Sequence, residues 1–160
     1  MSVSPIAFRA AVHEQLDAFM SARGFTVAAA EPDVVRYESA NVFVQFGHAA
    51  HDSEIYARIG RLGLGAEAAD RESESLDVGL FLAVADPDAH LALSREVPSA
   101  CADTQADVQR VLSHFARGLE LHGRRLLSGD PAEYASARSL RFWHARPSPP
   151  HEYGSATPKA

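Results

Sequence analysis

Four segments of alternating apolar and polar residues, joined by short links, most constrain the fold of this chain. They occupy residues 25–62. A period of two is typical of β-strands with one buried face. Parallel strands need crossover connections of a dozen or more residues, so the short links predict an antiparallel meander. The predicted strands are Phe25–Ala29, Val34–Ser39, Val42–His48 and Glu54–Leu62.

Helical patterns lie on both sides of the strand region. Ser4 and Pro5 open an N-terminal helix that extends to about Arg23, with a hydroxyl cap followed by proline in the first turn. The longest helix begins after Thr104, whose hydroxyl is predicted to cap it, and it extends to about Leu127. A last helix begins at Pro131. The apolar stripe of the longest helix contains Val108, Val111, Leu112, Phe115, Leu119 and His122.

The segment Leu76–Ala85 fits two structures. Its apolar run is compatible with a buried strand, but a short helix capped by Ser75 fits it as well. We favour the helix, which would turn Leu76, Leu80, Ala83 and Val84 inward. A further short helix or turn is expected around Pro87–Ser94.

The element order predicts one α+β domain over residues 1–145. The N-terminal helix is expected to pack on about four antiparallel strands, and a helical C-terminal half is expected to cover the same face or an edge. A chain of 160 residues with 46% hydrophobic content suits a single globular core. Residues 146–160 contain four prolines and few apolar residues, so we predict a disordered tail.

The net charge of −6 narrows the classes of partner. An acidic chain repels phosphate backbones, so we expect no nucleic acid partner, whereas a basic protein would be attracted. The longest apolar run, Leu80–Ala85, is far shorter than the roughly 20 residues that cross a bilayer, so we expect no membrane span. Cys101 is the only cysteine, which excludes an internal disulfide and indicates a reducing compartment, the cytoplasm.

Catalytic and cofactor motifs fail on their spacing or context. Gly63–Ala68 reads G-x-G-x-x-A, but the strands before it are antiparallel and the following residues are acidic, unlike a dinucleotide site. His13 and Glu14 begin an H-E-x-x-H pattern, but Asp17 stands where the second zinc ligand belongs. We find no nucleophile elbow and no P-loop. The sequence therefore favours a non-enzymatic protein without a cofactor.

One hairpin link is the best candidate for a metal or ligand site. His48, His51, Asp52 and Glu54 lie close together there, and imidazole and carboxylate groups are ligands of zinc. A solvated polar turn explains the same residues, because the other ligands would have to come from elsewhere in the fold. The alternative function is therefore a small-ligand or metal-binding protein, including an enzyme, that uses His48–Glu54.

Two further surfaces are candidates for contact with a partner. An acidic stretch combines five carboxylates with one arginine, and a basic, aromatic end closes the last helix. Arginine and tryptophan are favoured where proteins bind one another. The predicted contact residues are Glu67, Asp70, Glu72, Glu74, Asp77, His48, Asp52, Glu54 and Trp143.

Several segments together resemble a known group of proteins. They are Tyr37–Ser39 with Val42–Val44, Ile55–Arg61 and Leu126–Tyr134. The chain resembles small uncharacterised α+β proteins of GC-rich bacteria, and some proteins of this size and acidity are immunity partners of secreted or contact-delivered toxins. The resemblance implies an immunity or antitoxin-type protein that occludes a functional surface of its partner. A homodimer closed through an exposed sheet edge is a further alternative.

Overall fold

A computed structural model describes the backbone of residues 3–63 and 75–144, and their side chains except those of residues 5, 6 and 140–144. The predicted α+β order is confirmed: a helix, an antiparallel sheet and a helical C-terminal half follow one another. The elements are α1 (Pro5–Ser21), β1 (Thr26–Glu31), β2 (Val34–Glu38), β3 (Val42–Ala49), β4 (Glu54–Arg61), β5 (Leu76–Asp77), α3 (Val78–Ala85), α4 (Pro87–Glu96), η2 (Pro98–Ala100), α5 (Gln105–His122), α6 (Arg124–Leu127) and α7 (Pro131–His144).

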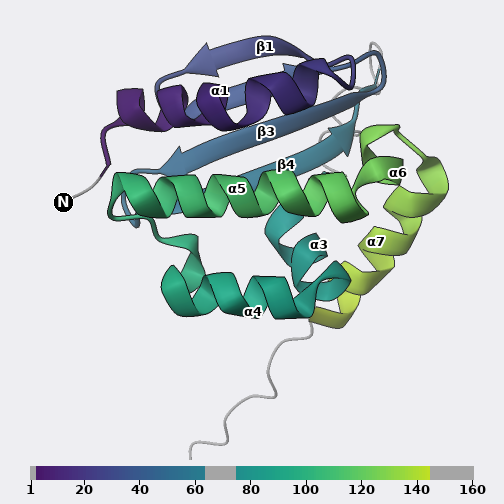
Figure 1. The fold of residues 1–160 in the computed structure, drawn as a ribbon. Helices are drawn as coiled ribbons and strands as arrows, with labels where there is room; N and C mark the ends of the chain where they lie inside the picture. Colours follow the sequence, from purple (N-terminus) through teal and green to yellow (C-terminus); the bar gives the residue numbers. More distant parts are fainter. Residues whose placement is uncertain (1–2, 64–74, 145–160) are drawn as a thin grey trace, which may run out of the picture.

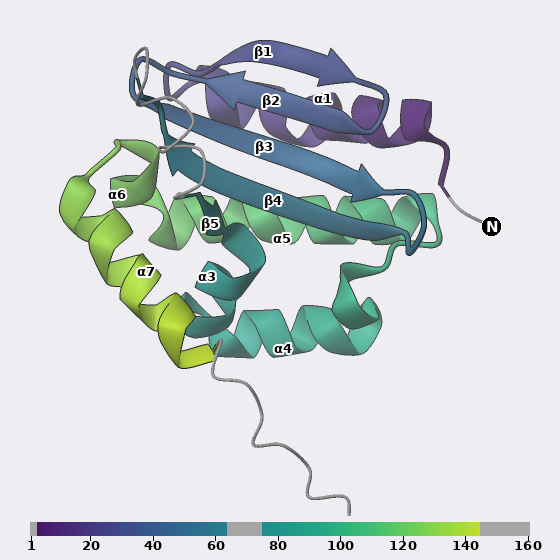
Figure 2. The same cartoon turned by 180° about the vertical axis from the view of Figure 1, so that it is seen from behind.

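The sheet is an antiparallel meander in the order β1-β2-β3-β4-β5, as the short links predict. A fifth strand of two residues joins the four predicted ones and pairs with Arg58 and Ile59 at the end of β4. Helices α1 and α5 lie side by side on one face of the sheet (Figure 1), and the described helices leave the other face open (Figure 2). Helices α3, α4, α6 and α7 continue beyond the β4 edge.

The core lies between the sheet and α1 and α5. Alternation in β3 turns Val42, Val44, Phe46 and His48 toward the helices, and all four side chains are buried. The two helices contribute buried side chains to the same core. These are Phe8, Val12, Leu16 and Met20 of α1 and Val108, Val111, Leu112, Phe115 and Leu119 of α5. The apolar stripe predicted for the longest helix therefore packs against the sheet and α1, except that His122 is only partly buried.

The register of α3 differs from the prediction. Its N-cap is Asp77, whose Oδ1 accepts a hydrogen bond from the backbone N–H of Leu80 at 2.9 Å, and not Ser75. The helix therefore begins at Val78, which turns inward together with Leu82. Residues two positions away lie about 200° around an α-helix. Leu80 and Val84 consequently point outward, and their predicted inward orientation is wrong.

The long helix of the C-terminal half is interrupted where a single helix to Leu127 was predicted. Gly123 separates α5 from α6, and a Cβ atom there would come within 2.9 Å of the Leu119 side chain and backbone. Gly129, with a φ of +78°, follows α6 and suits the left-handed backbone at a helix end. The predicted tail at 146–160 lies outside the described residues.

Candidate functional site

The outer side of α3 is apolar and exposed. Every side chain of this 8-residue helix is apolar, apart from Gly79, and such a composition is typical of a helix that other elements surround. Yet only Val78 and Leu82 are buried, while Leu80 is 49% exposed and Val84 is 36% exposed. Residues four apart are neighbours on a helix surface. We call Leu80 and Val84 the outer stripe of α3.

A pocket of about 260 Å³ adjoins the outer stripe. Its walls come from β4, the start of α3, α4, η2 and α5, and Leu80 belongs to both the wall and the stripe. It lies where the sheet edge is incomplete. In the described part of the chain, β5 pairs only with Arg58 and Ile59, and one isolated bridge joins Glu54 to Cys101. The apolar lining residues are Ile55, Leu80, Leu93, Val97, Ala100 and Phe115.

Strained backbone gathers at the Glu54 end of the pocket. Among the described residues, three that are not glycine have positive φ angles: Ser53 (58°), Ser99 (55°) and Ala100 (53°). Ser99 and Ala100 line the pocket, and Ser53 precedes Glu54, which also lines it. Each such conformation costs on the order of 1–3 kcal/mol and is common at binding sites. The hydrogen bond from Ala102 N–H to the Ser53 carbonyl, at 2.9 Å, ties the strained segments together.

The pocket carries negative charge. Glu54 and Asp77 line it, and its described lining contains neither arginine nor lysine. The same negative charge acts on Cys101 beside the pocket. Burial raises the pKa of the Cys101 thiol, and the carboxylates of Asp52, Glu54 and Asp103 raise it further. The thiol is therefore protonated at neutral pH, and three carboxylates act on one end of the pocket.

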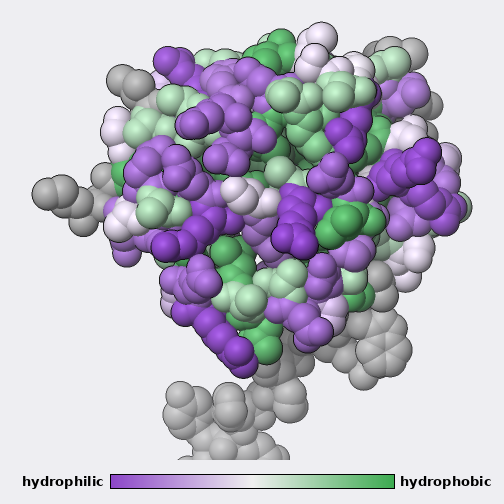
Figure 3. Space-filling model, in the orientation of Figure 1, coloured by the Kyte–Doolittle hydropathy of each residue, from purple (hydrophilic) through white to green (hydrophobic). Residues whose placement is uncertain are grey.

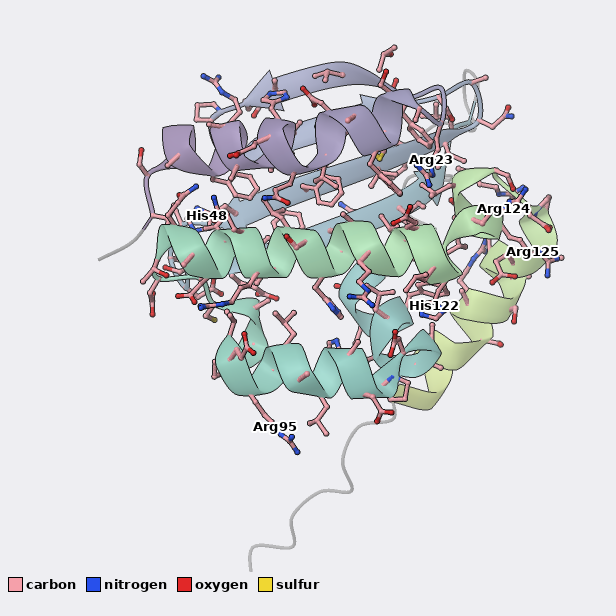
Figure 4. All side chains as sticks on the ribbon, viewed as in Figure 1. Arg23, His48, Arg95, His122, Arg124 and Arg125 are labelled. Carbon is pink, nitrogen blue, oxygen red and sulfur yellow. The ribbon has the colours of Figure 1, made fainter. Side chains whose placement is uncertain are left out.

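Arginines lie around other hollows of the surface. One hollow between α4 and α5 includes Arg110 and Arg117, and another, at the junction of α1 with α5 and α6, includes Arg23 and Arg124. Figure 4 shows Arg23, Arg124 and Arg125 around α6, at the opposite end of the molecule from His48. The face over α1 and α5 is mostly hydrophilic, with small separate hydrophobic areas (Figure 3). The acidic pocket is thus distinct in charge from these hollows.

Two histidines form the pocket wall between α4 and α5. The rings of His90 and His114 lie 5.8 Å apart with an interplanar angle of 49°. Within the described residues, His90 Nδ1 and His114 Nε2 are buried and have no hydrogen-bond partner. Burial lowers the pKa of His114, and His90 lowers it further, whereas the Asp86 carboxylate acts in the opposite direction. The His114 imidazole is therefore neutral at pH 7.

A second histidine of α5 anchors the start of α4. His122 Nε2 lies 3.1 Å from Asp86 Oδ2, and Asp86 Oδ1 accepts the backbone N–H of Ala89 as the N-cap of α4. The hydrogen bond with His122, followed by that from Ala89, holds the pKa of Asp86 below its usual value. Since α4 has no fully buried residue, these contacts and the buried Val97 position it over the pocket.

The structure brings two of the predicted contact residues together, one from the hairpin link and one from the start of α3. Glu54 and Asp77 both line the pocket, although they are far apart in sequence. Asp52 accepts the backbone N–H of Glu54 at 3.1 Å and pairs with His51 at 3.2 Å, and the His51 side chain is 84% exposed. His51 and Asp52 thus form a solvated turn at the strained end of the pocket.

His48 does not share that surface. It is 3% exposed on the helix-covered face of β3, and its ring stacks on Phe8 with centroids 5.6 Å apart. Neither ring nitrogen has a hydrogen-bond partner among the described residues. The fold therefore separates His48 from His51, Asp52 and Glu54. The described part of the chain contains no group of three or more potential ligands positioned to hold a metal ion.

The remaining predicted contact residues lie where the structure describes no side chains. Glu67, Asp70, Glu72 and Glu74 belong to residues 64–74, outside the described residues. Trp143 lies near the end of α7, and its side chain is likewise outside the described part.

Sequence reasoning missed four residues of the site: the outer stripe, Leu80 and Val84, and the histidine pair, His90 and His114. The sequence does contain an indication of the stripe: the 8 residues of α3 include no polar side chain. A helix at the edge of a domain exposes one of its sides, so in an entirely apolar helix that side is apolar. The histidine pair has no local indication, because the packing of α4 on α5 brings the two residues together.

Comparisons with known proteins add no family or fold neighbour: no family model, no curated protein and no solved structure matches this chain. None of the helices in the described segments is both long and apolar enough to cross a membrane.

Proposed function

We propose that this chain is a non-enzymatic protein-binding module of the immunity or antitoxin type. It binds a basic protein partner through the outer stripe of α3 and the adjoining pocket, and it occludes a functional surface of that partner. Its single cysteine suits action in the cytoplasm. The resemblance to small acidic bacterial proteins supports the immunity type, and the site supports binding.

The observation that carries the proposal is that Leu80 and Val84, two side chains of an entirely apolar helix, are exposed. Apolar surface inside a polar rim is typical of protein-binding sites, and here Leu80 continues the outer stripe into the apolar lining of the pocket. Here the polar neighbours are acidic: Asp77 caps α3, Asp86 separates α3 from α4, and Asp88 lies in the first turn of α4. A core of apolar contacts inside a polar rim is the usual anatomy of a protein interface.

The charge of the chain favours a basic partner. The net charge is −6, and the pocket beside the outer stripe has carboxylates without arginine or lysine in its described lining. Complementary charge increases the rate of association and disfavours acidic competitors. Contacts of the apolar stripe would then hold the complex, because they are not screened by salt.

The proposal is tested by capturing partners from the native cells with three forms of the tagged protein. The wild type is compared with the double variant Leu80→Ser/Val84→Ser and with the control Leu121→Ser. Leu121 is 58% exposed on α5, more than Leu80 or Val84, so the control removes an exposed apolar side chain elsewhere. Retained proteins are identified by mass spectrometry at about 0.15 M and about 0.5 M salt, where the Debye length falls from about 8 Å toward 3 Å.

We expect one stoichiometric basic protein that the wild type and Leu121→Ser retain and the double variant loses. Part of it should dissociate at the higher salt concentration. An acidic partner, equal retention by the double variant or no partner at either salt concentration would overturn the proposal. A wild-type dimer that the double variant loses would overturn it too, since the stripe would then bind a second copy of this chain.

A further inference from the structure

We infer that the pocket between β4 and α4 receives one arginine side chain of the protein partner, with its guanidinium group beside Glu54. This inference rests on the proposed function. It specifies which side chain of the partner the site recognises. The outer stripe of α3 supplies apolar contact area, whereas the pocket supplies specificity.

The size of the pocket fits a single long side chain. Its volume of about 260 Å³ is below the range of roughly 300–1,000 Å³ that is usual for pockets holding drug-sized ligands. The inner lining is apolar, from Ile55, Leu93 and Val97, so it suits the methylene groups of an arginine stem.

The charge of the pocket points to a cation, and Glu54 is the lining carboxylate that is available as its counter-ion. The Glu54 side chain is exposed and makes no ion pair with another described residue. Asp77, by comparison, already accepts a hydrogen bond from Leu80 as the cap of α3. Asp52 and Asp103 add negative potential at the Glu54 end, where they act with Glu54 on Cys101. A guanidinium presents a planar fork of N–H donors that matches one carboxylate with two hydrogen bonds.

The other side chains of the wall do not oppose a cation at neutral pH. His114 is neutral there, because burial and His90 both disfavour its protonated form. Ser94 and Ser99 add hydroxyl groups that accept hydrogen bonds from a guanidinium. The other two hollows each contain two arginines and one glutamate in their lining, so they lack the purely acidic lining of the pocket.

The test uses the full chain and two probes of one shape and different charge. N-acetyl-arginine N-methylamide carries a guanidinium, and N-acetyl-citrulline N-methylamide is its neutral isostere. Each is titrated into labelled protein at pH 7.5, and the backbone amide signals are followed by NMR. We expect saturable shifts of the Ile55, Tyr56 and Gly79 amides with the arginine probe, at a Kd on the order of 1–10 mM for one isolated side chain.

Two variants test whether the Glu54 carboxylate is the group that binds the guanidinium. Glu54→Gln should raise the Kd of the arginine probe by about two- to fivefold, as expected for loss of an exposed charged pair. Glu14→Gln is the matched control, because Glu14 is exposed on α1 and does not line the pocket; it should leave the Kd unchanged.

Equal binding of the citrulline probe, absence of saturable shifts at the pocket, or an unchanged Kd in Glu54→Gln would overturn the inference. The titration requires no partner, so its failure is distinguishable from failure of the proposed function. A partner lost by Leu80→Ser/Val84→Ser, together with no arginine binding, would leave the proposed function standing and remove only the pocket assignment.

Discussion

Leu82 of α3 packs directly against Gly118 of α5, and this contact leaves no room for a Cβ atom at position 118. Both residues are buried. The close approach of the two helices fixes which side of α3 faces the core. It therefore also fixes which side, with Leu80 and Val84, faces outward.

Gly118→Ala should consequently destabilise the protein by about 1–3 kcal/mol, because the new methyl group overpacks against Leu82. Alanine is intrinsically the better helix former by about 1 kcal/mol, which opposes part of this loss. Urea unfolding measures the change. In a Leu82→Ala background the methyl group has space, so the penalty should fall by about 1 kcal/mol or more. Strictly additive effects of the two substitutions would show that the contact does not set the position of α3.

The hydrogen bond between Tyr37 and Asp17 joins the sheet to α1. The Tyr37 hydroxyl donates to Asp17 Oδ1 at 2.6 Å, and His13 also contacts this carboxylate. Burial by itself would raise the pKa of Asp17, but the hydrogen bonds from Tyr37 and His13 hold it below its usual value. The carboxylate form therefore stabilises the fold above the unfolded pKa of 3.8, and this contribution is lost as the pH falls through the lower folded pKa.

Tyr37→Phe should reduce the free energy of unfolding at pH 7 by about 1.5–3 kcal/mol, the range for a hydrogen bond to a charged group. The difference from wild type should shrink when Asp17 is protonated at low pH. Tyr134→Phe is the control, because the Tyr134 hydroxyl donates to the neutral backbone carbonyl of Leu126 at 3.0 Å. Its effect should not change between pH 7 and pH 3. A pH-independent effect of Tyr37→Phe would contradict the assignment.

The stability of the fold should depend on pH through His114. Its folded pKa lies below the ordinary 6.5, because burial and His90 disfavour the charged form. Stability is therefore complete above pH 6.5, and it decreases as the pH falls from 6.5 toward the folded pKa. Two groups on the α4 side face His114, the Asp86 carboxylate and the His90 imidazole. The charged groups nearby are Glu54 and Asp77 across the pocket, and Glu96, Arg110 and Arg117 in the hollow on its other side.

His114→Gln removes this proton-linked loss while keeping a polar side chain at the position. Between pH 7.5 and pH 5.5, the wild type should lose more stability in urea unfolding than the variant. Comparison of the two proteins isolates His114 from the other histidines, including the His122–Asp86 pair. An identical pH dependence in both proteins would show that His114 is not desolvated as described.

Local patterns were sufficient to predict most of the fold. Period-two alternation identified β2, β3 and β4 to within a residue or two at each end, because each signal lies within one strand. The same alternation groups His48 with Val42, Val44 and Phe46, and so it already indicated a buried imidazole. Its assignment to a surface site followed from proximity in sequence to His51 and Asp52, which is a weaker indication than strand periodicity.

The candidate site depends on contacts between distant segments and could be predicted only in part. Glu54 and Asp77 were recognised as acidic candidates, but their shared pocket arises from the pairing of β5 with β4. That pairing also draws Leu76 and Asp77 out of the helix, which shifts the cap of α3 and exposes Leu80 and Val84. No pattern within residues 76–85 specifies this pairing, so the orientation of α3 requires the fold.

The most direct test of the central claim, that α3 forms the binding surface, is hydrogen–deuterium exchange of the protein alone and in complex with its captured partner. Amides of residues 78–85 lie in a short helix at the edge of the domain, so in the free protein they should exchange faster than those of α5. Binding should slow exchange in α3 and at the Glu54 end of β4. Protection confined to β1 or to residues 64–74, with α3 unchanged, would contradict it.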